Sequence, residues 1–107
     1  MAGSSDKPKA LTVLQALNLA VQHHSAGRLS EAESVYRQIL QSHPDQIDAL
    51  HLLGAIANQV GKNDIAIDLI TKAIAIKPDF AEAHNNLGNA LGKLGRAVES
   101  EASYRRA

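Results

Sequence analysis

Five histidines are the first candidates for chemistry in this chain. His23 and His24 are adjacent, so on a helix they would point about 100° apart and could not bind one metal ion together. His43 directly precedes Pro44, and we expect it to face water or the terminal carbonyls of a helix. These three residues therefore predict no metal or catalytic site.

The other two histidines are His51 and His84. We expect His84 to pack against its surroundings, whereas His51 is a candidate for a binding surface. The chain has no cysteine, and no arrangement of serine, histidine and acid is recognisable. Its carboxylates are scattered, and we expect them to be solvated. The sequence therefore predicts no catalytic residue, no metal site and no cofactor.

Three asparagines form a denser cluster: Asn85, Asn86 and Asn89. On a helix they lie within one turn, because residues three and four apart are neighbours. A side-chain amide both donates and accepts, so it can pair with the N–H and C=O of an extended peptide. The cluster predicts a surface that binds peptide backbone, and the alternative is a merely solvated helix face.

The elements that position these residues follow from a repeat of 34 residues. Pro44 and Pro78 have this spacing, as do Gly27, Gly61 and Gly95. Each period divides into an A helix and a B helix, and a glycine between them favours the left-handed conformation that ends a helix. The predicted helices are 13–26, 29–42, 47–60, 63–76, 81–94 and 97 onward.

Small residues recur where the two helices of each unit should cross. Gly54 and Gly88 occupy one position of the A helix, with Ala20 as their small equivalent. We expect these small residues to allow close approach, so that large side chains beside the crossing fill the remaining space. The predicted packing residues are Leu19, Ala20, Ala32, Tyr36, Leu53, Gly54, Ala66, Leu87, Gly88 and Tyr104.

This pattern resembles the tetratricopeptide repeat (TPR) family, in which leucine-glycine, alanine, an aromatic residue and proline mark each unit of 34 residues. The second unit reads Leu53-Gly54, Ala66, Ile70 and Pro78. The resemblance implies an all-α, right-handed solenoid of antiparallel helix pairs. The expected organisation is a disordered tail at 1–10 and a TPR domain at 11–107, with units at 13–46, 47–80 and 81–107, the last incomplete.

The resemblance also implies a concave groove lined by the A helices. The groove residues that it predicts are Asn18, His51, Asn58, Asn85, Asn86 and Asn89. Asn18 and Asn86 share the sixth repeat position, where peptide O-GlcNAc transferases with this repeat carry asparagine; the chain is weakly similar to bacterial arrays of that kind. Glu82 stands where chaperone-binding members have a cation that holds a terminal carboxylate, so that specialisation is excluded.

Composition narrows the partners further. Eleven basic residues balance eleven acidic ones, which argues against a nucleic-acid partner. The chain has no apolar run long enough for a membrane span, and its first ten residues do not resemble a signal peptide. We therefore expect a cytoplasmic protein that binds a protein or peptide.

Two functions remain open at this point. The chain is an autonomous adaptor that binds an extended peptide or partner helix, or it is the N-terminal substrate-recruiting part of a larger enzyme such as a glycosyltransferase. Because the third B helix stops before its period closes and has no successor, we also expect self-association through this uncapped C-terminal helix.

Overall fold

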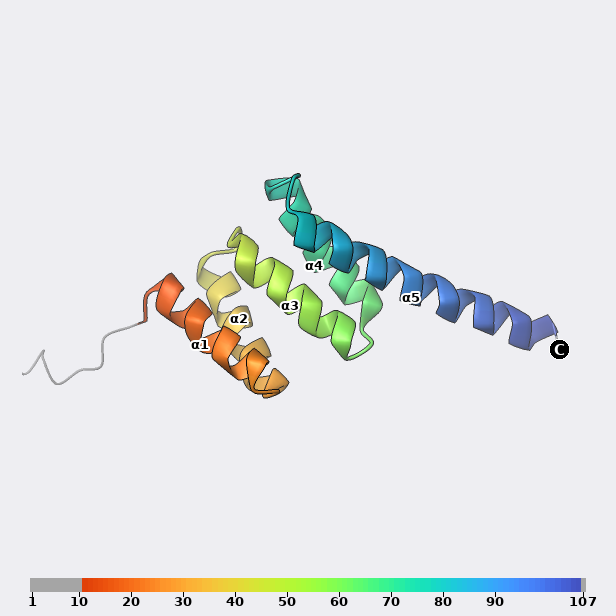
Figure 1. The fold of residues 1–107 in the computed structure, drawn as a ribbon, viewed down its shortest axis with the longest axis horizontal. Helices are drawn as coiled ribbons and strands as arrows, with labels where there is room; N and C mark the ends of the chain where they lie inside the picture. Colours follow the sequence, from red (N-terminus) through yellow and green to blue (C-terminus); the bar gives the residue numbers. More distant parts are fainter. Residues whose placement is uncertain (1–10, 107) are drawn as a thin grey trace, which may run out of the picture.

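The computed structural model describes residues 11–106, with side chains as far as Arg96. Its helices are α1 (Val13–Ser25), α2 (Leu29–Ser42), α3 (Ile47–Gln59), α4 (Asn63–Ile76) and α5 (Ala81–Arg106) (Figure 1). Residues 11–106 contain no strand, so the predicted all-α class is confirmed. The tail at 1–10, predicted to be disordered, lies outside the described residues, and so does the side chain of Tyr104.

The helices form an α-solenoid of antiparallel pairs, as the resemblance implies. Helices α1 and α2 make one antiparallel pair, and α3 and α4 make the next (Figure 1). Helix α3 is central, because it packs against α2, α4 and α5. We call α1, α3 and α5 together the A-helix layer. Helices α2 and α4 lie behind this layer in the view of Figure 1.

Side chains and glycines set the ends of these helices. Thr12 and Gln15 form a capping box at the start of α1, which satisfies backbone N–H groups that would otherwise lack partners. Gly27 and Gly61 have φ angles of 80° and 84° and follow α1 and α3. After Gly27, the amide of Arg28 donates back to a carbonyl in the last turn of α1, as in a Schellman ending.

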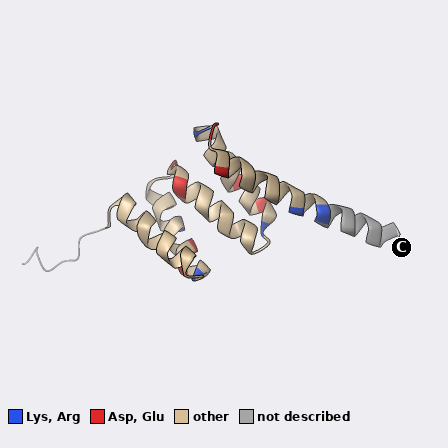
Figure 2. Cartoon of the chain, viewed as in Figure 1, with Lys and Arg blue, Asp and Glu red and all other residues tan. Residues whose placement is uncertain are grey.

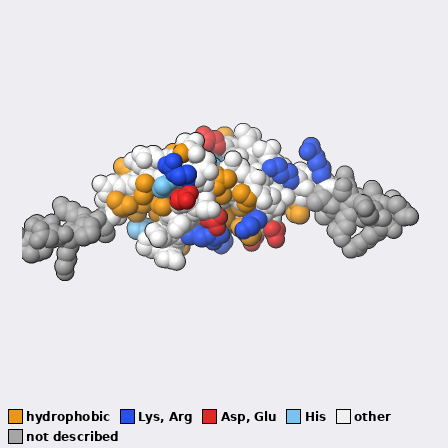
Figure 3. Space-filling view, turned by 90° about the horizontal axis from the view of Figure 1, so that it is seen from below, with side chains coloured by type: hydrophobic (Ala, Val, Ile, Leu, Met, Phe, Trp, Pro, Cys, Tyr) orange, Lys and Arg blue, Asp and Glu red, His pale blue; other side chains and the backbone are white. Residues whose placement is uncertain are grey.

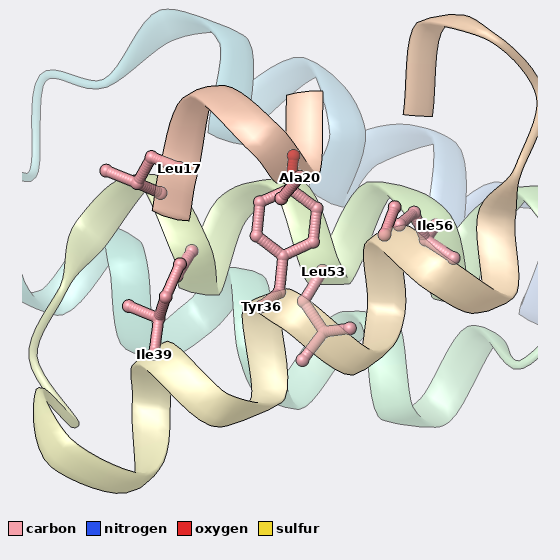
Figure 4. Close-up of a cluster of buried hydrophobic side chains, with 8 residues drawn as sticks. Leu17, Ala20, Tyr36, Ile39, Leu53 and Ile56 are labelled. Carbon is pink, nitrogen blue, oxygen red and sulfur yellow. The ribbon is translucent and has the colours of Figure 1, made fainter. Parts of the chain in front are cut away.

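The first core cluster lies between α1, α2 and α3 and is centred on Tyr36 (Figure 4). Tyr36 is fully buried, and so are the small residues Ala20 on α1 and Ala32 on its own helix. Because these alanines occupy little volume, the tyrosine ring fills the space between the helices. A second cluster joins α3, α4 and α5 and contains Ala57, Ala66, Ile70, Ala83 and Ala90.

Gly54 marks the close crossing of α3 and α4. A Cβ atom at Gly54 would lie 2.6 Å from Cγ1 of Ile70 and 3.5 Å from the carbonyl oxygen of Ala66. Both residues on α4 are fully buried. The second unit therefore has the tight glycine crossing that its sequence predicts.

The third unit differs from the prediction. Helix α5 continues through Gly95, where the sequence predicted a helix end and a separate B helix from residue 97. Gly88 is consequently exposed, and a Cβ atom there would meet nothing within 4 Å. The packing role assigned to Gly88 was wrong for this structure, because no B helix within residues 11–106 folds back against its face of α5.

Leu19 also departs from its predicted packing role, since it is 37% exposed whereas its repeat equivalent Leu53 is 3% exposed. Leu53 belongs to the first core cluster, against which Leu40 of α2 and Leu69 of α4 pack. In residues 11–106, no helix precedes α1 to cover Leu19 in the same way. Leu19 lines an open cavity of about 330 Å³ on the outer side of the α1–α2 pair.

Candidate functional site

The six predicted groove residues all lie on the A-helix layer, but they differ in depth. Asn18 on α1 and both Asn85 and Asn89 on α5 are exposed, whereas Asn86 is half-buried. His51 and Asn58 on α3 are only 4% and 7% exposed. These two were predicted to face the groove and instead lie buried, because α5 packs over that side of α3.

His51 connects the second and third units. Its Nε2 accepts a hydrogen bond of 2.8 Å from the side-chain amide nitrogen of Asn86 on α5. The ring also packs on Phe80, with centroids 4.6 Å apart and planes tilted by 53°. Burial lowers the pKa of His51 below its usual 6.5, although the nearby carboxylates of Glu82 and Asp48 oppose the shift. The neutral imidazole therefore acts as a hydrogen-bond acceptor between helices.

Two further hydrogen bonds also join one A helix to the next A helix of the layer. Nε2 of His24 donates to Oε1 of Gln59 over 2.8 Å, which joins α1 to α3. Nζ of Lys93 donates to the backbone carbonyl of Asn58 over 3.2 Å, which joins α3 to α5.

Each of these three pairs is separated by 35 residues. A position on one A helix thus meets the next position of the following A helix. Sequence reasoning missed these bonds, although for two of them, His24 with Gln59 and His51 with Asn86, a pair of polar residues one period plus one residue apart was visible in the sequence.

Asn58 is, with His51, one of the two buried polar residues of α3. Its Oδ1 is buried and has no hydrogen-bond partner among the described residues. Because its side chain is buried beneath α5, Asn58 contributes to the contact between helices, and it does not offer its amide to a ligand in this conformation.

Charge is distributed unevenly along the A-helix layer. Asp48 and Glu82 lie in the first turns of α3 and α5, and acidic colour marks both helix starts in Figure 2. Lys93 and Arg96 lie further along α5. The face in Figure 3 mixes both signs of charge, and its apolar side chains lie both near the N-terminal end and in the middle of the stack. On that face, no single sign of charge dominates.

The described residues offer little for other chemistry. Among the side chains that the structure describes, which extend from residue 11 to Arg96, no three histidine or acidic groups gather closely enough to hold a metal ion. Within the same range, no helix combines the length and apolar character that crossing a membrane requires. The accessible polar groups of the A-helix layer include the side-chain amides of Asn18, Asn85 and Asn89, which can both donate and accept hydrogen bonds.

Comparison with known families gives two matches that together cover most of the described helices. A model described as "Tetratricopeptide repeat" matches residues 13–56, and one described as "TPR repeat" matches residues 58–95. The second match includes Gly88 and ends at Gly95, within α5.

Individual relatives are larger proteins. The chain is 30% identical over 90 residues to mouse (Mus musculus) DnaJ homolog subfamily C member 3, which covers 84% of the chain and 18% of that protein. It is 37% identical over 79 residues to a probable UDP-N-acetylglucosamine–peptide N-acetylglucosaminyltransferase of Arabidopsis thaliana. That match covers 74% of the chain and 8% of the transferase.

A solved structure shares the architecture. A mutant of the Thermobaculum terrenum O-GlcNAc transferase superposes with a TM-score of 0.74 at 33% identity, over 82% of this chain and 18% of that one. The chain thus spans less than a fifth of each of these three proteins. The similarity concerns a run of helical repeats and covers only a small part of each transferase.

Proposed function

The chain consists of tetratricopeptide repeats, and from this premise we propose that it is a protein-interaction module whose A-helix layer binds an extended peptide or a partner helix. The observation that carries the proposal is the exposure of Asn18, Asn85 and Asn89 on that layer. Their amides are free to pair with the backbone of a bound polypeptide, because each offers both a donor and an acceptor.

The buried polar residues support this role indirectly. The bond between His51 and Asn86 and the bond between Lys93 and Asn58 hold α5 against α3. Because these contacts fix the spacing of the two helices, the exposed amides of α5 are presented on a preformed surface. Preformed surfaces lose less conformational entropy when they bind.

A second candidate function is that of a substrate-recruiting segment within a larger enzyme. The similarity to two O-GlcNAc-type transferases favours it, since both matches fall on repeats and not on the remainder of each enzyme. Asn18 and Asn86 also share the sixth position of their repeats. Under this reading the chain binds the polypeptide on which a separate catalytic domain acts.

The experiment is a selection of random dodecapeptides on the purified chain, followed by titration of the peptides obtained. The variant Asn18→Ala/Asn85→Ala/Asn89→Ala should weaken binding at least tenfold while its circular dichroism stays unchanged. Asn86 is retained, because its loss would disturb His51. The matched control is Gln38→Ala/Gln41→Ala, which removes two exposed amides from α2. Equal affinity of the triple variant and the control would refute the assignment.

A further inference from the structure

The middle of the A-helix layer is apolar. Helix α3 lies between α1 and α5 in this layer (Figure 1). From Ala49 to Asn58, Leu52 and Ala55 are the only residues of α3 that are not buried. His51 and Asn58, the polar side chains of this segment, are only 4% and 7% exposed. A ligand that crosses the layer therefore meets aliphatic side chains on its central helix.

Helix α1 extends this apolar surface to one side. Leu14 and Val21 are 66% and 42% exposed. They flank Asn18 on one face of α1, because positions 14, 18 and 21 of a helix lie within an arc of about 60°. The hydrogen bond between His24 and Gln59 joins α1 to α3. We call Leu14, Val21, Leu52 and Ala55 together the apolar patch.

Side-chain amides lie on both sides of the central helix. Asn18 is exposed on α1, and Asn85 and Asn89 are exposed on α5. Helices α1 and α5 are two helix spacings apart, which corresponds to about 16–20 Å. An extended chain advances about 3.3 Å per residue, so about five or six residues span this distance. The residues halfway along such a segment lie over Leu52 and Ala55.

The two features together favour an extended chain over a helix as the occupant. The backbone N–H and C=O groups of an α-helix already bond to one another, so the asparagine amides would find few backbone partners on it. An extended chain leaves these groups free, and its successive side chains point to opposite faces. Alternate side chains of such a chain therefore face the layer while its backbone pairs with the amides.

We propose that the ligand of the A-helix layer is an extended polypeptide segment with a large apolar side chain at its centre, which rests on the apolar patch. This inference depends on the proposed peptide-binding function of the layer and adds a side-chain preference to it. Contact with the patch removes apolar surface of both partners from water, which favours binding. A serine at the same place in the ligand would contribute little apolar surface.

A dodecapeptide selected on the purified chain is the probe. Each residue of the tightest peptide is replaced in turn by serine, and dissociation constants are measured by fluorescence anisotropy. We expect one central apolar residue, or two that are two positions apart, to account for a loss of at least tenfold. Sensitive apolar residues spaced three, four and seven positions apart would indicate a bound helix and would overturn the proposal.

Variants of the patch test where that side chain binds. Val21→Thr/Leu52→Gln should reduce the affinity ratio between the apolar peptide and its serine form from at least tenfold to below threefold. The matched control, Val60→Thr/Leu91→Gln, makes the same replacements at residues that are each 50% exposed outside the patch. It should keep the full ratio. An unchanged ratio in a folded patch variant would contradict the assignment.

A second patch variant covers the case in which Leu52→Gln disturbs the fold, because Leu52 also packs against the first core cluster. Leu14→Gln/Val21→Thr changes only exposed residues, so its circular dichroism should match that of the unmodified chain. Its affinity ratio should fall at least threefold. A ratio equal to that of the control would again refute the patch.

The amide variant Asn18→Ala/Asn85→Ala/Asn89→Ala separates this inference from the proposed function. It should bind both peptides more weakly and keep the tenfold ratio between them. If the amide variant loses binding while the patch variants keep the ratio, backbone pairing stands and the apolar patch is refuted. If the amide variant binds normally while the patch variants lose the ratio, the amide assignment fails and the patch stands.

Discussion

The imidazole of His51 on α3 accepts a hydrogen bond of 2.8 Å from the side chain of Asn86 on α5. The two residues are 35 positions apart, one more than the repeat length. The contact joins two successive units at a buried position, where an unpaired nitrogen would be costly. This hydrogen bond explains why His51 and Asn86, which were predicted to bind a ligand, instead hold α3 and α5 together.

Stability should fall at acidic pH because of His51. Burial lowers the folded-state pKa of His51 below 6.5, against the opposing effect of Glu82 and Asp48. The ring of Phe80, which packs on His51, also has the cation of Lys77 at 5.3 Å from its centre. Below about pH 6.5 the unfolded chain therefore binds a proton that the folded chain resists.

The His51 contribution is thus complete above pH 6.5 and is lost as the pH falls toward the folded-state pKa. Urea denaturation between pH 7.5 and 5 measures the effect. The variant His51→Gln keeps a hydrogen-bonding side chain that does not titrate, so its stability should change less over this range. Identical pH profiles for the two proteins would contradict the role of His51.

Tyr36 should tolerate loss of its hydroxyl but not loss of its ring. The hydroxyl oxygen is buried without a partner among the described residues, and burial, with a smaller effect of Asp48, raises the pKa of Tyr36 to about 12. Removing an unsatisfied polar group relieves a penalty of about 1–3 kcal/mol, so Tyr36→Phe should be neutral or stabilising.

Tyr36→Ala would leave a cavity in the first cluster and should cost about 3–5 kcal/mol, as for other large aromatic residues. Both free energies of unfolding come from chemical denaturation. If Tyr36→Phe lost more than about 1 kcal/mol, its hydroxyl would have a partner that this structure does not show.

One substitution at equivalent repeat positions should have opposite effects. Gly54→Ala places a Cβ atom 2.6 Å from Cγ1 of Ile70, and such overpacking costs about 1–3 kcal/mol. Gly88→Ala meets no atom within 4 Å and should stabilise the chain by up to about 1 kcal/mol through helix propensity. Thermal denaturation at low protein concentration compares the two. Destabilisation by both would indicate that α5 forms a closed hairpin.

The repeat register predicted the first four helices well, because Gly27 and Gly61 have the left-handed conformation that the spacing implies. It failed at Gly95, where α5 continues. A glycine permits a helix to end but does not force it to.

The repeat register was less informative about how deeply each side chain is buried. Repeat position indicates which side of an A helix a residue occupies, and His51 and Asn58 do lie on the side toward α5. Their burial depends on how closely the next unit packs, which a spacing of 34 residues does not specify. Asn18, Asn85 and Asn89 remained exposed because no other helix covers them in residues 11–106.

Binding through the A-helix layer is tested most directly by NMR mapping of a selected dodecapeptide on the isotope-labelled chain. The account predicts the largest amide shifts around Asn18 on α1 and around Asn85 and Asn89 on α5, with side-chain amides of those residues among them. Shifts concentrated on α2 and α4, with the A-helix layer unchanged, would contradict it.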